Sequence, residues 1–146
     1  MRRTLKAVGA AAAAATCVLA ATAGTAQAEA PKTMSLYAPS ALVFTVGQGE
    51  DAGSATVERA VTLTCAPRPG GSHPAAAAAC AELNQVNGQF TALVGSSSDA
   101  ICTKEWQPVT VTAAGVWNGK HVAWSKTFAN RCEMKAGLGE GVALTF

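Results

Sequence analysis

Residues 99–109, with the sequence DAICTKEWQPV, contain a cysteine, a lysine and a proline at a spacing that could present a lysine side chain for binding. If Cys102 forms a disulfide, the loop around Lys104 is fixed on one side by sulfur and on the other by Pro108 and the strand that follows. A segment that is ordered in advance loses less entropy when another protein binds it. Trypsin-like proteases bind such lysines, because a carboxylate in their specificity pocket pairs with the ammonium group. On loop geometry alone, a solvated surface lysine is an equally good interpretation.

No group of residues in the sequence has the pattern of a catalytic site. There is no G-x-S-x-G motif, and the serines at 96–98 lie in a Gly/Ser-rich stretch typical of a connector. Residues 137–141, GLGEG, lack the lysine of a phosphate-binding loop and are interpreted as a turn before a last strand. We expect His73 to be a surface or cap residue where a helix starts, and His121 to be a surface residue beside a hairpin turn. The sequence therefore predicts a protein that is not an enzyme.

The first 28 residues have the features of a secretory signal peptide. A basic start, MRRTLK, precedes an uncharged alanine-rich stretch and the small residues AQA. We expect cleavage after Ala28, which predicts a secreted, extracellular protein without a membrane anchor. Two minor alternatives are twin-arginine export through Arg2 and Arg3 and lipidation at Cys17.

The basic character of the whole chain comes from this leader. The chain has 11 Lys and Arg against 9 Asp and Glu, and three of the basic residues lie in the first six positions. The remainder, residues 29–146, is near neutral and has no basic stripe, so nucleic acid and anionic membranes are not expected partners. Its length suits one compact domain.

Four cysteines remain after the leader, which in an oxidising exterior indicates two disulfides. Three pairings are possible. We favour Cys65 with Cys80 and Cys102 with Cys132, since sequential pairing closes short loops around recognisable elements. The chain has no C-x-x-C motif and two histidines, so neither a metal site nor another cofactor is expected.

Most of the remaining pattern is typical of strands. We expect strands at 40–47, 58–65, 108–117, 120–128 and 141–146, a helix over 72–88 and a second short helix after residue 90. Asn118 and Gly119 predict a type I′ turn, which requires positive φ at both central positions. These elements predict an antiparallel sheet with at least one helix on a face.

Several longer segments resemble the Streptomyces subtilisin inhibitor family across the whole mature domain. They are LYAPSALVFTVGQGE, ERAVTLTCAP, GSHPAAAAACAEL, GVWNGK and TFANRCEM. The resemblance implies an α+β fold, with a five-stranded antiparallel sheet, two helices on one face and two disulfides. It also implies a homodimer formed through the sheet, and an inhibitor that extracellular serine proteases bind like a substrate.

The same resemblance implies which residues meet the protease. The family's reactive bond follows the third mature cysteine by two residues, which in this sequence is the bond between Lys104 and Glu105. The residues expected to contact the protease beside that bond are Ile101, Cys102, Thr103 and Trp106. Asn130, two residues before Cys132, is expected to support the loop together with Pro108. The alternative for Asn130 is that it caps a turn.

A different class of function remains open from the residues themselves. A secreted, β-rich ligand-binding module without inhibitory activity could use Trp106, Trp117 and Trp124 as an aromatic platform, although core and interface positions are commoner for tryptophan. In that case the Lys104 loop has no function of its own.

Overall fold

The structure is a computed structural model, and it describes residues 38–95 and 100–146. The predicted leader at 1–28, its cleavage point after Ala28 and the serines at 96–98 lie outside the described residues. Within the two described ranges, no helix is both long and apolar enough to span a membrane.

The described residues form a five-stranded antiparallel sheet, as the family resemblance implied. The strands lie in the order β3-β2-β1-β4-β5. Their bounds are Ser40–Gln48 for β1, Thr56–Ala66 for β2, Gly70–Gly71 for β3, Val109–Trp117 for β4 and Lys120–Phe128 for β5. The four longer strands were predicted from the sequence. The two-residue β3 was missed, because it consists of two glycines without strand propensity.

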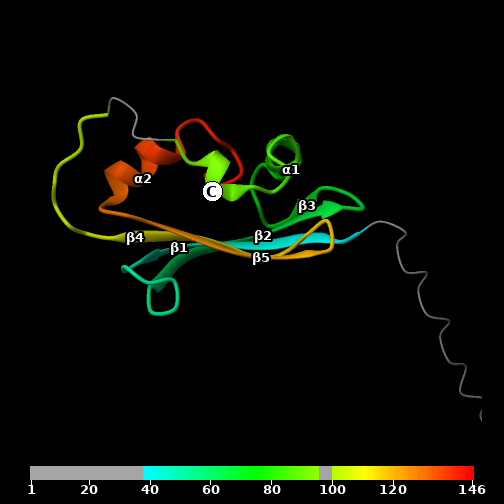
Figure 1. Ribbon diagram of the computed structural model, residues 1–146, viewed down its shortest axis with the longest axis horizontal. Coiled ribbons are helices and arrows are strands. Elements are labelled where there is room, and N and C mark those ends of the chain that lie inside the picture. The colour runs from blue at the N-terminus through cyan, green and yellow to red at the C-terminus, as the bar shows by residue number, and fades with distance from the viewer. Residues whose placement is uncertain (1–37, 96–99) are drawn as a thin grey trace, which may run out of the picture. The chain divides into compact units, whose positions relative to one another are not determined.

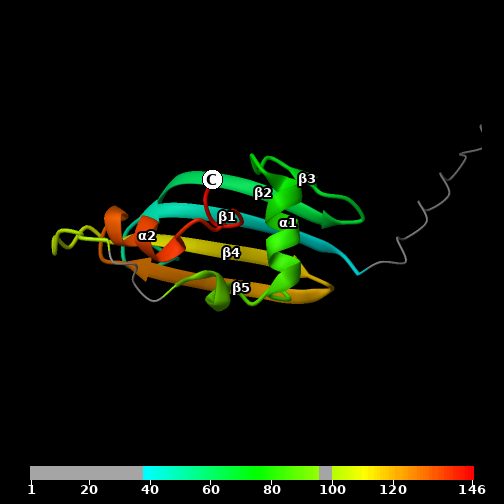
Figure 2. The same ribbon diagram turned by 90° about the horizontal axis from the view of Figure 1, so that it is seen from above.

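Two α-helices cover one face of the sheet, which confirms the expected α+β fold (Figures 1 and 2). They are α1, Ala76–Gln85, and α2, Arg131–Leu138. The short helix expected after residue 90 is present as a 3-10 helix, η1, Phe90–Leu93. The hydrophobic core lies between the helices and the sheet, because alternate residues of β1 and β4 point to this face and are buried.

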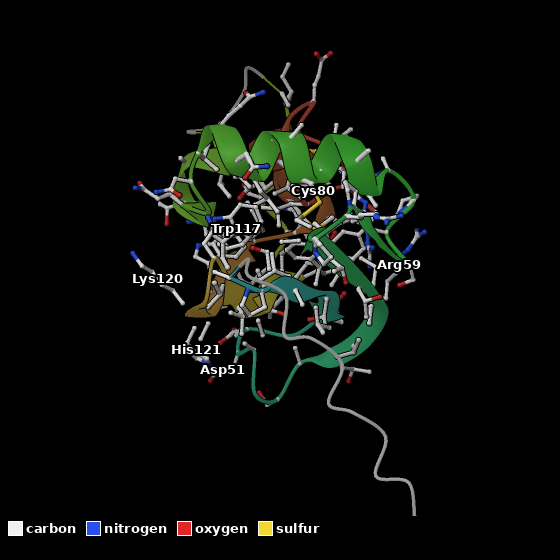
Figure 3. The ribbon with its side chains drawn as sticks, turned by 90° about the vertical axis from the view of Figure 1, so that its right-hand side faces the viewer. Asp51, Arg59, Cys80, Trp117, Lys120 and His121 are labelled. Carbon is white, nitrogen blue, oxygen red and sulfur yellow. A yellow bond between two sulfur atoms is a disulfide. The ribbon has the colours of Figure 1, made fainter. Side chains whose placement is uncertain are left out.

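α1 ends where its sequence predicted. Asn87 and Gly88 adopt positive φ angles of 49° and 71°, the conformation that ends many helices. Gly88 is also required for packing, since an added Cβ would overlap the indole ring of Trp117. Figure 3 shows Trp117 beneath α1, and the disulfide from Cys80 joins the same helix to Cys65 of β2.

The turn between β4 and β5 has the predicted backbone conformation. Asn118 and Gly119 have φ angles of 47° and 77°, as a type I′ turn requires. This turn sets the register of the two strands, in which Trp117 pairs with Lys120 and Val109 with Phe128.

One prediction for the C-terminal region is wrong, and a second is right only in part. The expected strand at 141–146 is a series of turns, in which Glu82 of α1 accepts hydrogen bonds from the backbone N–H groups of Val142 and Ala143 at 2.7 and 2.6 Å. These bonds replace a strand partner. The turn expected at 137–141 is present at 139–140, but residues 137 and 138 belong to α2, where Gly137 packs against the ring of Phe128.

His73 is buried rather than on the surface, with 5% of its area exposed, and its ring packs in a cluster with the rings of Phe44 and Phe146. Its Nδ1 accepts a hydrogen bond from the N–H of Ala75 at 3.1 Å, which orders the turn before α1, but Ala75 is the N-cap and no side chain caps the helix, so the expected capping role is wrong. His121 is exposed at the start of β5, as predicted (Figure 3). Burial lowers the pKa of His73 below 6.5, against a smaller opposing contribution from the backbone of Ala143.

This lowered pKa predicts that His73 makes the fold acid-sensitive. As the pH falls below about 6.5, His73 binds a proton more readily in the unfolded chain than in the folded chain. The free energy of unfolding therefore decreases by at most about 1.4 kcal/mol per pH unit. His73→Asn retains an acceptor for Ala75 and should lose less stability between pH 7 and pH 5 than the wild type does. Urea unfolding at several pH values measures this. The exposed His121→Asn variant is the control and should behave like the wild type; equal pH slopes in all three proteins would contradict the prediction.

Candidate functional site

The segment 100–107 contains neither helix nor strand and extends beyond the end of the sheet (Figure 2). It leads into β4 at Val109. The loop between β1 and β2 lies at the same end of the sheet (Figure 1). This segment holds most of the site residues predicted from the sequence.

A disulfide joins this segment to α2. It links Cys102 to Cys132, the second residue of the helix, and with the Cys65–Cys80 disulfide it confirms the pairing favoured from the sequence. A covalent bond therefore fixes the chain two residues before Lys104.

Asn130 supports the same segment through hydrogen bonds. Its side chain is buried, and Nδ2 donates to the backbone carbonyls of Thr103 at 2.9 Å and Glu105 at 3.1 Å. Its Oδ1 accepts from the N–H of Glu133 at 3.0 Å, which makes Asn130 the N-cap of α2. The two roles considered for Asn130, loop support and capping, therefore occur together in one side chain.

The far end of the segment is held by the backbone. The N–H of Gln107 donates to the carbonyl of Ala129 at 2.8 Å. The half-buried Pro108 accepts from the N–H of Gly49 at 2.9 Å and from Nε2 of Gln48 at 2.8 Å. Pro108 thus supports the loop through its carbonyl oxygen, in addition to the stiffness of its ring.

The side chains at and between these attachments point into solvent. Ile101 is fully exposed, Lys104 is 92% exposed and Trp106 is 60% exposed. The ammonium of Lys104 lies 3.9 Å from a carboxylate oxygen of Glu133, a pair too exposed to restrain the lysine strongly. The carboxylate of Glu105 accepts from Nε2 of Gln107 at 2.8 Å. The site is a projecting, pre-ordered chain and not a cleft.

A cavity of about 570 Å³ lies behind this segment, between α2 and the end of β5. Its lining includes Lys104, Lys126, Phe128 and Glu133. Among the described residues, no cluster of three or more His, Cys, Asp or Glu side chains could hold a metal ion. Nor do the tryptophans form a platform, because Trp117 is in the core while Trp106 is on the projecting segment.

Sequence reasoning missed the part of the site that comes from the β1–β2 loop. Glu50 contacts Trp106 in the projecting segment, and Gln48 and Gly49 contact Pro108 at its end, although all three precede their partners by more than fifty positions. No local motif marks them. The contacts arise from the pairing of β1 with β4, which brings Gln48 beside Val109.

Comparison with known proteins gives consistent matches. The family model described as subtilisin inhibitor-like matches residues 38–130. A subtilisin inhibitor of Streptomyces violaceus is 84% identical over the full length of both chains, and kexstatin-1 of Streptomyces platensis is 56% identical over 86% of this chain and 90% of its own. Among solved structures, Streptomyces caespitosus sermetstatin in complex with Bacillus licheniformis subtilisin has a TM-score of 0.70 and 46% identity, covering 74% of this chain and 99% of that one.

Proposed function

The chain belongs to the subtilisin inhibitor-like family, and from that premise we propose that it is a secreted inhibitor of serine proteases and not an enzyme. The observation that carries the proposal is the projecting segment 100–107, which presents an exposed lysine between two fixed ends. The sermetstatin structure, in which a similar protein is bound to subtilisin, supports the same class of partner.

The proposed reactive bond joins Lys104 to Glu105. A protease that binds the segment like a substrate attacks the carbonyl carbon of Lys104, and the amine of Glu105 is the leaving group. Asn130 donates to the carbonyls on either side of this bond, so the amine stays close to the acyl carbon after cleavage. Re-formation of the bond then competes with hydrolysis, and tight binding of the intact chain gives slow turnover.

The exposed residues favour two classes of protease. The ammonium group of Lys104 suits the carboxylate in a trypsin-like pocket. In a subtilisin-like pocket, its aliphatic stem can lie on an apolar wall while the charge stays near water. Ile101, Thr103 and Trp106 are the further contacts that we propose for the protease.

The test of this function is titration of trypsin and of subtilisin with the purified, exported protein. We expect stoichiometric inhibition of both enzymes. The same preparation tests the proposed export, because a leader cleaved after Ala28 leaves Glu29 as the first residue. Both disulfides are consistent with an oxidising exterior. A protein that inhibits neither trypsin nor subtilisin would refute the proposed function.

We further propose that two chains pair through the sheet face that the helices leave uncovered. Val43, Ala114 and Ala123 form a row of small apolar side chains across β1, β4 and β5 on this face, and Val43 is 43% exposed. A flat row of small residues can meet its own copy about a two-fold axis, which gives an isologous interface.

Sedimentation should therefore find a dimer at micromolar concentration. Ala114→Glu places a charge in the middle of this row and opposite its copy, so this variant should sediment as a monomer. The variant should still inhibit, because the contacts of segment 100–107 do not involve this face. A wild-type protein that sediments as a monomer would contradict the proposal.

A further inference from the structure

We propose that Glu50 is a positioning residue for the chain that follows the reactive bond, and that it acts through Trp106 to favour re-formation of that bond after cleavage. The indole N–H of Trp106 donates to a carboxylate oxygen of Glu50 at 2.7 Å. This inference rests on the proposed function, because it concerns the peptide bond between Lys104 and Glu105.

The two sides of that bond are held by different means. On the acyl side, the Cys102–Cys132 disulfide attaches the chain covalently to α2. On the amine side, the described contacts before β4 are hydrogen bonds, from Asn130 to the carbonyl of Glu105 and from the N–H of Gln107 to Ala129. Trp106 lies between these two attachments, and its side-chain bond to Glu50 fixes the residue next to the new amine.

Glu50 is itself held in place by the sheet. The hydroxyl of Thr127, on β5, donates to the carbonyl of Glu50 at 2.7 Å, and the hydroxyl of Thr110, on β4, donates to the carbonyl of Gly49 at 2.7 Å. Gly49 in turn donates to the carbonyl of Pro108. The backbone of Glu50 is therefore fixed, which limits the positions that its exposed carboxylate can reach.

Cleavage adds one water across the bond, leaving a carboxylate on Lys104 and an amino group on Glu105, and re-formation releases that water. In the intact chain, the bond itself restrains Trp106 from the acyl side. In the cleaved chain this restraint is gone, so the contact with Glu50 forms at a larger entropic cost and stabilises the cleaved form less than the intact one. Removal of the contact should therefore shift the equilibrium towards the cleaved form.

The test uses the ratio of cleaved to intact inhibitor at equilibrium, reached from both directions with a catalytic amount of trypsin. This ratio depends on the two forms of the inhibitor and not on how either contacts the protease. Glu50→Ala and Trp106→Phe each remove the hydrogen bond and should raise the ratio by up to about tenfold, the limit for one typical hydrogen bond that is formed in the intact chain and weakened in the cleaved one. The double variant should show no further rise, because both changes remove the same contact.

Two further variants are controls. Glu50→Gln retains an oxygen acceptor for the indole and should give a ratio closer to the wild type. Asp51→Ala removes a neighbouring negative charge, outside the contact with Trp106, and should leave the ratio unchanged.

An unchanged ratio in Glu50→Ala would overturn the inference, as would additive effects in the double variant. A wild-type protein that trypsin neither binds nor cuts after Lys104 would refute the proposed function instead, and this inference with it. Mass spectrometry after reduction identifies the new amino terminus at Glu105 and separates the two cases.

Discussion

Replacing Lys104 with glycine is expected to abolish inhibition of trypsin while measurable inhibition of subtilisin remains. The substitution removes both the stem and the charge, and it leaves the carboxylate in the trypsin pocket buried without its partner. The usual cost of that loss is about 2–5 kcal/mol, or several powers of ten in the inhibition constant. Against subtilisin the loss should be smaller, since Ile101 and the extended backbone still make contacts.

Lys104 has no strong contact in the free protein that must be broken before a protease can bind it. Its ammonium group is paired with Glu133 only at 3.9 Å and in solvent, so moving it into a pocket costs little. Lys104→Arg is the matched control and should inhibit both enzymes, because arginine supplies the same charge. Inhibition constants of both variants against trypsin and subtilisin test this role of Lys104. Unchanged trypsin inhibition by Lys104→Gly would show that the reactive bond lies elsewhere.

Local sequence patterns predicted the elements whose conformation depends on a few neighbouring residues. The β4–β5 hairpin follows from Asn118 and Gly119, whose positive φ angles suit one turn type. The end of α1 follows from Asn87 and Gly88 in the same way. In both cases the backbone preference of two residues determines the structure, so tertiary context changes little.

Elements stabilised by distant contacts could not be predicted in this manner. The C-terminal residues alternate like a strand, yet Glu82, sixty positions earlier, accepts from their backbone and holds them in turns. α2 was not located from the residues because it is short and Gly137 weakens its helical pattern. Its start has a recognisable feature, an N-cap asparagine followed three residues later by glutamate, which could have revealed it.

In the candidate site, too, residues that are close in sequence were predicted and a residue joined by distant contacts was not. Cys102, Lys104 and Pro108 lie within seven residues, so their joint role could be read from spacing, and Asn130 could be placed through the disulfide next to it. Glu50 could not be predicted as part of the site, because its contact with the loop depends on the register between β1 and β4.

The dual role of Asn130 allows the loop and the helix to be tested separately. Its Nδ2 holds the carbonyls of Thr103 and Glu105, while its Oδ1 caps α2 at Glu133. Serine is a good N-cap but is too short to donate to both carbonyls, whereas alanine performs neither task. Asn130→Ser and Asn130→Ala therefore differ in the cap and share the loss of loop support.

Both variants should inhibit roughly 10- to 100-fold more weakly than the wild type, because each loses two hydrogen bonds that are individually worth about 1 kcal/mol. Both should also be hydrolysed faster at the Lys104–Glu105 bond, since the amine of Glu105 is no longer held near the acyl carbon. Their stabilities should differ: Asn130→Ala should unfold about 1 kcal/mol more easily than Asn130→Ser, which keeps the cap. Inhibition constants, cleavage rates and urea unfolding of the two variants measure these effects. If Asn130→Ser inhibits as tightly as the wild type, the cap is the whole role of Asn130, and the disulfide and the backbone hydrogen bonds at Gln107 and Pro108 hold the loop.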